Sequence, residues 1–188
     1  MKIVRIETLI EAGAFPRSRD CRRIRSQVLE AIRMVEWPPN SGAFTLYDEC
    51  GKKRGSGSGV TPIKTACMLH LQAQRWVLEP PLDVGTVTRP GRMDAALQVG
   101  GRHFCVEWET GNISSSHRAL NKIALGIIKG VLVGGLLIVP TREMYRYLTD
   151  RIGNFMKLEP CFPPWRQLNS KSFSSEYYGL WTLALREC

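Results

Sequence analysis

The chain has 188 residues, enough to bury a substantial core, and we expect a single domain spanning residues 1–188. Its composition, 44% hydrophobic and 23% charged, excludes a globally disordered protein. A formal net charge of +9 favours a polyanionic partner, either nucleic acid or an anionic membrane surface, although a basic surface that is simply solvated gives the same charge.

The first predicted helix spans Asp20 to Trp37, where apolar residues recur at helical spacing and arginines occupy the opposite face; the sequence WPPN ends it. A short strand is expected within Ser41–Glu49. The segment Gly51–Gly59, GKKRGSGSG, is predicted to be a flexible loop. Its Lys52 and Arg54 are either solvated or contact a phosphate backbone.

The second helix is expected to begin with Thr61 as its N-cap and Pro62 in the first turn, and to end near Val77. A proline-rich connector, EPPLDVGTVTRPG, follows it. Two short runs come next, MDAALQV and RHFCVEWE, joined by Gly100 and Gly101. A Gly-Gly pair suits a two-residue hairpin turn because both central positions need a positive φ, so we predict a β-hairpin here.

This turn fixes the register of the hairpin. Counting back from the glycines pairs Val99 with Arg102 at one end and Asp94 with Glu107 at the other. The pairs between them are Gln98 with His103, Leu97 with Phe104, Ala96 with Cys105, and Ala95 with Val106.

Strand alternation places these side chains on two faces. One face is wholly apolar and is expected to pack on a core helix; its members are Met93, Ala95, Leu97, Phe104, Val106 and Trp108. The other face gathers three carboxylates, those of Asp94, Glu107 and Glu109, among Arg92, Ala96, Gln98, His103 and Cys105. A slip of one residue would remove both features together.

Like charges that face each other across a sheet are destabilising, so Asp94 and Glu107 need a cation or a shared proton. One interpretation is an ion-pair network, in which Arg92 faces Glu109 and other basic neighbours assist. The second interpretation is a divalent metal. Mg²⁺ takes one or two carboxylates, keeps several waters and binds phosphate oxygens, which is what phosphodiester hydrolysis requires.

Four elements are predicted after the hairpin: a helix over Ile113 to about Lys129, a buried central strand over Val131–Val139, a helix over Thr141–Ile152 and a strand over Tyr178–Leu185. The apolar run from Ile123 to Pro140 is interrupted by a lysine and three glycines, so a helix end and a covered strand explain it better than a membrane span. This order of elements indicates an α/β domain with a central mixed β-sheet flanked by helices.

The arrangement of an acid, a hairpin and then Glu-x-Glu leading into a helix resembles the core of the PD-(D/E)XK nuclease superfamily. The stretch CVEWETGNISSSHRALNKIALGII is similar to the BamHI and BglII group of type II restriction endonucleases. That group also carries Glu-x-Glu or Glu-x-Gln, then a small residue, Gly-Asn and a helix. The resemblance covers about Arg92 to Tyr147. It implies a restriction-endonuclease-like core and a Mg²⁺-dependent nuclease in which Mn²⁺ can substitute.

The resemblance also implies roles for individual residues. Asp94 and Glu107 would bind the metal, with the backbone carbonyl of Trp108 as a further ligand. Glu109 stands where most of the superfamily has lysine, which matches the BamHI-like branch and implies a carboxylate that orients or deprotonates the attacking water. Asp94, Glu107 and Glu109 are therefore the expected catalytic residues. Glu79 is the nearest candidate for the upstream acid of that branch.

The start of the helix after the acids is a candidate phosphate site, because amide N–H groups at a helix start attract anions. Capping of this helix by a serine is compatible with that role. The candidate DNA contacts are Asn112, Ser114, Ser115, Ser116 and Arg118, with Lys52, Arg54 and Arg142 elsewhere. The resemblance implies a homodimer, whose two related active sites suit two cuts in a palindrome. Lys122 is assigned to the surface or the interface rather than to catalysis.

The sequence thus predicts a type II restriction enzyme that cuts double-stranded DNA at a short palindromic site. Two alternatives stay open: a nuclease of the same core for DNA repair, recombination or phage DNA processing, and a non-catalytic DNA-binding protein. None of the six cysteines has C-x-x-C spacing, so no zinc site is expected. Scattered thiols and an N-terminus without a signal-peptide pattern indicate a cytoplasmic protein with no membrane partner.

Overall fold

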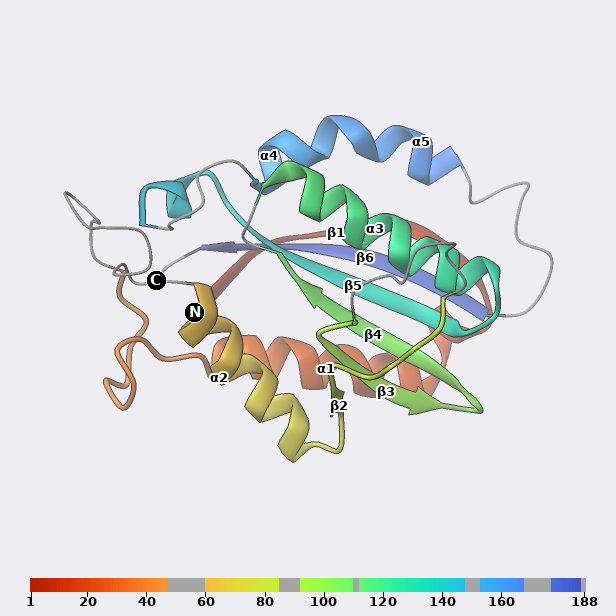
Figure 1. Cartoon of the computed structure of the whole chain (residues 1–188), viewed down its shortest axis with the longest axis horizontal. Helices are drawn as coiled ribbons and strands as arrows, with labels where there is room; N and C mark the ends of the chain where they lie inside the picture. Colours follow the sequence, from red (N-terminus) through yellow and green to blue (C-terminus); the bar gives the residue numbers. More distant parts are fainter. Residues whose placement is uncertain (47–59, 85–91, 110–111, 148–152, 168–176, 187–188) are drawn as a thin grey trace.

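A six-stranded mixed sheet runs through the molecule in the order β1-β6-β5-β4-β3-β2 (Figure 1). The computed structural model describes residues 1–46, 60–84, 92–109, 112–147, 153–167 and 177–186. The strands are β1 (Lys2–Gly13), β2 (Val77–Leu78), β3 (Ala95–Val99), β4 (Arg102–Trp108), β5 (Leu132–Pro140) and β6 (Tyr177–Arg186). Strand β5 pairs in parallel with both β4 and β6, and the other neighbours are antiparallel.

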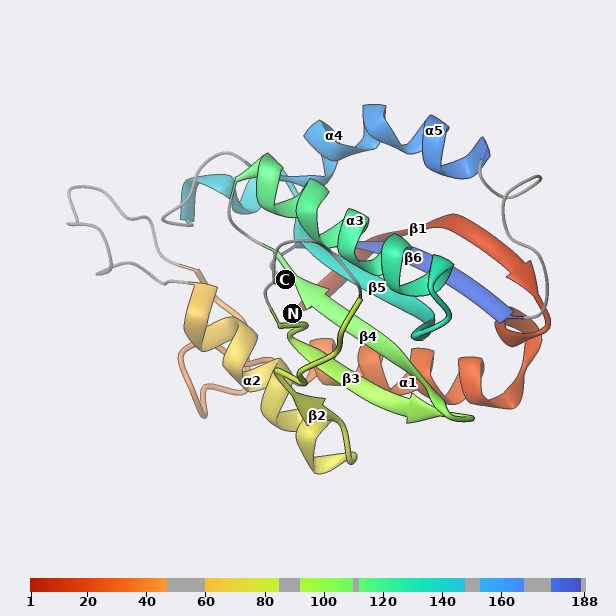
Figure 2. The same ribbon diagram turned by 45° about the vertical axis from the view of Figure 1, so that its right-hand side comes forward.

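Helices cover both faces of this sheet (Figures 1 and 2). One face carries α3 (Ile113–Ile128), α4 (Phe155–Leu158) and α5 (Phe162–Gln167), and the other carries α1 (Arg19–Arg33) and α2 (Val60–Ala73). Short 3-10 helices, η1 (Phe15–Arg17), η2 (Glu143–Tyr147) and η3 (Glu159–Cys161), lie between them along the chain. The predicted fold class, a central mixed sheet flanked by helices, is confirmed.

The core is divided by the sheet into two apolar clusters, one on each face. Along β5, Leu136 packs with the residues of α1 and α2, whereas Leu137 packs with those of α3. Every residue of β5 is buried, as expected for a strand covered on both faces. Helix α3 approaches closely, since a Cβ atom added to Gly135 would lie 2.5 Å from Cγ2 of Ile123. The predicted buried central strand is therefore confirmed.

The β3–β4 hairpin has the predicted turn and register. Gly100 and Gly101 both have positive φ angles, 53° and 81°. All five pairs predicted within the two strands are formed, from Val99 with Arg102 to Ala95 with Val106. The apolar face packs toward α1 and α2, and its members there are Ala95, Leu97, Phe104, Val106 and Trp108.

The open end of the hairpin differs from the prediction. The ladder stops at Ala95, so the pair of Asp94 with Glu107 is not formed as a strand pair. Instead, Oδ2 of Asp94 accepts a hydrogen bond of 2.7 Å from the backbone N–H of Trp108. Strand β3 begins only at Ala95, so the alternation of faces does not extend back to Asp94 and Met93. Met93 therefore packs in the apolar cluster on the α3 side of the sheet and not with Ala95.

Other differences concern the ends and the short elements of the fold. The prediction of an α-helix over residues 141–152 is wrong for the part that the structure describes, which forms the 3-10 helix η2. Met144 and Tyr147 enter the core from this helix, and their spacing of three residues matches its repeat. Helix α2 includes Val60, so Thr61 lies in its first turn and is not its N-cap. Neither β1 nor β2 was predicted. Residues 47–59, including the glycine-rich loop, lie outside the described residues.

The cysteines and the apolar segments were the other features that the composition singled out. Cys21, Cys67 and Cys105 are buried free thiols and Cys161 is a partly buried one; Cys50 and Cys188 lie outside the described residues. Within the described part of the chain, no helix is both long and apolar enough to cross a membrane.

Candidate active site

Several elements meet at the end of the hairpin that lies away from its glycine turn (Figure 2). Strand β4 ends at Trp108, and Asp94 lies beside it just before β3. Strand β2 pairs with β3, and the next residue, Glu79, donates its backbone N–H to the carbonyl of Asp94 at 3.1 Å. Glu79 has a φ of 46°, which is uncommon for glutamate and turns the chain here. Helices α2 and α3 add Lys64 and Lys122 from opposite faces of the sheet.

Each side-chain oxygen of Asp94 has a partner. Oδ1 forms an ion pair of 2.5 Å with Nζ of Lys64, and Oδ2 accepts the hydrogen bond from the Trp108 amide. The Asp94 side chain is 13% exposed and that of Lys64 is 34% exposed, so water reaches the lysine more readily than the acid. The aspartate is thereby held by the main chain of β4 and neutralised by a side chain from α2.

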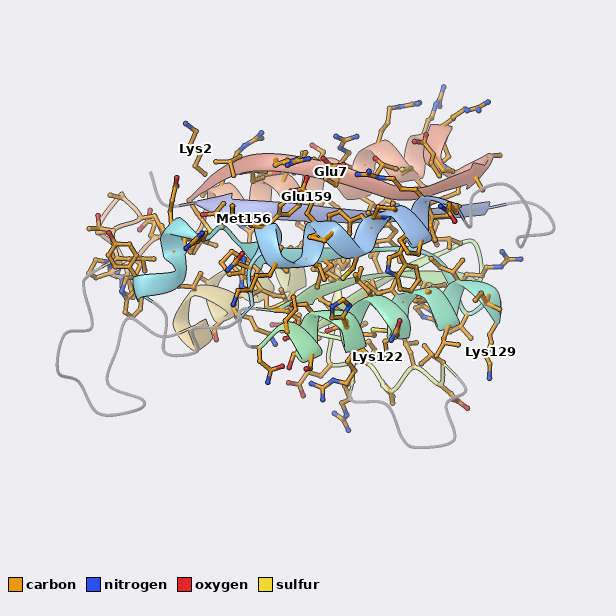
Figure 3. The ribbon with its side chains drawn as sticks, turned by 90° about the horizontal axis from the view of Figure 1, so that it is seen from above. Lys2, Glu7, Lys122, Lys129, Met156 and Glu159 are labelled. Carbon is orange, nitrogen blue, oxygen red and sulfur yellow. The ribbon has the colours of Figure 1, made fainter. Side chains whose placement is uncertain are left out.

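Glu107 is the most deeply buried of the three acids, with 3% of its surface exposed. Its Oε1 atom is sheltered from solvent and forms an ion pair with Nζ of Lys122. The Lys122 ammonium also donates a hydrogen bond of 3.0 Å to the carbonyl of Arg92. Figure 3 labels Lys122 on α3; the residue is buried, and its ammonium lies against Glu107 of strand β4. Its assignment to the surface or interface is therefore corrected.

Burial and the charge of Asp94 raise the pKa values of the two glutamates. Burial raises the pKa of Glu107 from its ordinary value of 4.5 to about 7; the charge of Asp94 acts in the same direction and Lys122 opposes it. Burial also raises the pKa of Glu109, with Asp94 adding to the effect and Arg118 opposing it. The cluster therefore contains carboxylates that resist ionisation and would be stabilised by an added cation.

The raised pKa of Glu107 predicts a pH dependence of stability in the metal-free protein. The folded protein binds this proton more tightly than the unfolded chain, so the stabilisation is complete below about pH 4.5 and is lost as pH rises to about 7. Its size is on the order of 3 kcal/mol, because each tenfold change in proton affinity is worth about 1.4 kcal/mol. Urea unfolding in EDTA should show this loss in the wild type and not in Glu107→Gln. Equal pH profiles for the two proteins would contradict it.

Glu109 continues from β4 along β5, and its backbone N–H donates to the carbonyl of Ile138 at 2.9 Å. Its side chain is half-buried beside the other acids. In the described ranges, no three acidic, histidine or cysteine side chains converge as a preformed metal centre. The ion-pair interpretation thus describes the contacts that are present, but the partners are lysines from α2 and α3 and not Arg92.

The same residues fit a hard divalent cation. Asp94 and Glu107 offer carboxylate oxygens, the ligand type that Mg²⁺ prefers. Glu107 is buried with Lys122 as its cationic partner, yet burial and the charge of Asp94 still raise its pKa to about 7, so a further cation would be favourable. A cation between these acids would also relieve their mutual repulsion. The site therefore has the chemistry of a metal site whose charge is balanced by two ammonium groups.

The candidate DNA contacts are placed unevenly. Asn112 caps α3, because its Oδ1 accepts a hydrogen bond of 2.9 Å from the Ser115 amide; the cap is not a serine. Ser116 is only 2% exposed, and this burial does not suit direct contact with phosphate. Exposed side chains among the candidates are Asn112, Ser114, Arg118 and Arg142. Lys52 and Arg54 lie outside the described residues.

Sequence reasoning missed the two lysines of the site. A signal for Lys122 was present, because it lies three residues after Ala119 and four before Gly126, on the buried face of α3. A lysine on such a face needs a buried charge partner. Lys64 offered no comparable signal, since its contact with Asp94 joins residues 30 positions apart.

The amino-acid sequence matches proteins of a known family. A family model described as "Restriction endonuclease BamHI" matches residues 1–175. The chain belongs to the BamHI restriction endonuclease family. It is 47% identical over 171 residues to the type II restriction enzyme OkrAI of Oceanobacter kriegii, covering 91% of this chain and 84% of that protein. It is 35% identical over 144 residues to the type II restriction enzyme BamHI of Bacillus amyloliquefaciens, covering 73% and 66% of the two chains.

Membership of the BamHI family extends the resemblance seen around the acids to most of the chain. It confirms the prediction of a restriction endonuclease, which is a site-specific deoxyribonuclease, and with it the expectation that the partner is double-stranded DNA.

Proposed function

We propose that this chain is a Mg²⁺-dependent type II restriction endonuclease with a PD-(D/E)XK core, which acts as a homodimer and cuts both strands of a short palindromic DNA site. The observation that carries the proposal is the buried Glu107 beside Asp94: burial raises the pKa of Glu107 to about 7, and the charge of Asp94 adds to this effect. Burying a carboxylate costs stability. Groups whose pKa is shifted in this way occur preferentially at active sites, and a metal ligand is one such group.

Asp94 and Glu107 would hold the metal, with the carbonyl of Trp108 as a further ligand. Mg²⁺, when bound, neutralises charge on the scissile phosphate and makes a coordinated water more acidic. Glu79 supports the same site, because its backbone is hydrogen-bonded to that of Asp94 at 3.1 Å. This contact favours Glu79 as the upstream acid expected of the BamHI-like branch.

Glu109 would orient the attacking water and accept its proton. Burial and the charge of Asp94 raise the pKa of Glu109, which makes its carboxylate a better base than an exposed glutamate. Its position at the end of β4, tied to β5 through the Ile138 carbonyl, holds the carboxylate at a fixed distance along the strand from Glu107. The metal ligand and the base thus come from alternate residues of the chain, Glu107 within β4 and Glu109 just beyond its end.

The start of α3 would contact the DNA backbone close to these acids. Asn112 and Ser114 are exposed at the first turn, and Arg118 follows one turn later on the same helix. Amide dipoles at this end of a 16-residue helix favour an anion, and Arg118 adds a full positive charge. Arg142 is an additional exposed candidate for DNA contact.

Cleavage of plasmid and long linear DNA tests the proposal. With Mg²⁺ or Mn²⁺ the purified protein should produce discrete fragments whose ends map to one palindromic sequence, and EDTA should prevent this. A smear would instead support a nuclease of repair, recombination or phage DNA processing. Binding without cleavage in the presence of metal would support a non-catalytic DNA-binding protein. A mass of two chains in solution, measured by light scattering, is the expected assembly.

A further inference from the structure

We propose that Lys64 and Lys122 are built-in counter-ions of the acidic site and that they behave differently when metal binds. Lys64 is displaced from Asp94 by the incoming Mg²⁺, whereas Lys122 stays beside Glu107. The inference rests on the proposed metal site and adds a competition between a side chain and the metal. It makes Lys64 a determinant of metal affinity, and Lys122 a positioning residue.

Lys64 can leave its acid easily. Its side chain is 34% exposed and comes from α2, on the face of the sheet opposite α3. Its Nζ contacts Oδ1 of Asp94 at 2.5 Å, while Oδ2 of the same acid is held separately by the Trp108 amide. An ammonium on a flexible four-carbon stem is hydrated when it turns to solvent, so departure leaves no buried charge. Asp94 then keeps its position and presents Oδ1 to the metal.

Lys122 cannot leave in the same way. Its side chain is 10% exposed, and the Glu107 partner is 4% exposed. The ammonium faces Oε1 of Glu107 and also donates to the carbonyl of Arg92, so it is fixed by groups from β4 and from the segment before β3. Moving one member of a buried pair would strand the other as an uncompensated charge. Lys122 therefore keeps the site assembled whether or not metal is present.

Binding of Mg²⁺ to the intact protein, followed by calorimetry at about pH 8, tests the exchange without any cleavage. Lys64→Met removes the competing ammonium and should tighten Mg²⁺ binding about tenfold, the scale of a partly exposed ion pair next to a divalent ion. Lys64→Arg keeps the charge and should retain the wild-type affinity. Lys157→Met is the matched control, because Lys157 is an exposed lysine on α4 outside the site.

Thermal unfolding separates the second lysine from the first. In EDTA, Lys122→Met should melt at a clearly lower temperature than the wild type, whereas Lys64→Met should melt close to it. Added Mg²⁺ should raise the melting temperature of Lys122→Met more than that of the wild type, because the metal replaces the missing cation beside Glu107.

The outcomes are distinguishable. Equal or weaker Mg²⁺ affinity in Lys64→Met, with wild-type binding intact, would overturn the exchange and leave the metal site standing. An unchanged melting temperature for Lys122→Met in EDTA would overturn its structural role. Absence of Mg²⁺ binding by the folded wild type would overturn both this inference and the proposed function.

Discussion

Replacing Glu107 with glutamine should abolish DNA cleavage, lowering the rate by at least about a thousandfold, while the protein remains folded. Glutamine has nearly the same shape but cannot supply the anionic oxygen that a divalent metal needs, and metal at the scissile phosphate is worth several kcal/mol in the transition state. The fold should tolerate the change, because burial already raises the pKa of Glu107 to about 7, glutamine reproduces the neutral form, and its amide oxygen and the Arg92 carbonyl can still accept hydrogen bonds from Lys122.

Single-turnover cleavage, circular dichroism and a gel-shift assay on the same preparation check this result. Binding to DNA should persist within a fewfold of the wild type, since no candidate phosphate contact involves Glu107. Gln98→Ala is a suitable control, because Gln98 is exposed on the neighbouring strand β3. Loss of folding together with loss of cleavage would assign Glu107 a structural role, and full activity would remove it from the metal site.

Replacing Glu109 with glutamine should have a different signature from the change at Glu107. The cleavage rate should fall about a hundredfold to ten-thousandfold, the usual contribution of a positioned base. Mg²⁺ affinity should change little, because the role proposed for Glu109 is to act on the water and not to bind the metal. The wild-type rate should rise with pH as the Glu109 carboxylate, whose pKa is raised by burial, becomes ionised, and the variant should lack this rise.

Parallel calorimetry and single-turnover kinetics distinguish the base from the ligand. A loss of Mg²⁺ affinity as large as the loss of rate would make Glu109 a metal ligand. A variant with the same pH profile as the wild type would exclude Glu109 as the group that accepts the proton.

Local signals account for the parts of the fold that were predictable. Gly100 and Gly101 specify a tight turn, and the turn specifies every pair of the hairpin up to Ala95. The continuous apolar run of β5 indicates a strand covered on both faces, and α3 follows from helical periodicity. In each case the residues that determine the element lie close together in the sequence, within the element itself or in the adjoining strand of the hairpin.

Long-range contacts account for what was missed. Strand β1 pairs with β6, from the other end of the chain, and its charged residues hide the pattern of an edge strand. Strand β2 has two residues and exists through its pairing with Ala95 and Ala96. The same limit applies to the site. The hairpin register predicts that Asp94 and Glu107 lie close together, but their lysine partners come from helices distant in sequence, and only Lys122 has a local signal.

The amide that holds Asp94 belongs to the main chain of residue 108, so the anchor does not depend on which side chain stands there. The indole of Trp108 is buried in the core toward α1 and α2, where it packs against apolar side chains. Another large apolar side chain at this position would therefore leave the anchoring amide in place, whereas proline would remove it, because it alone lacks the N–H. The distance between Asp94 and the two glutamates is therefore set by a main-chain hydrogen bond and does not depend on the side chain that packs beneath it.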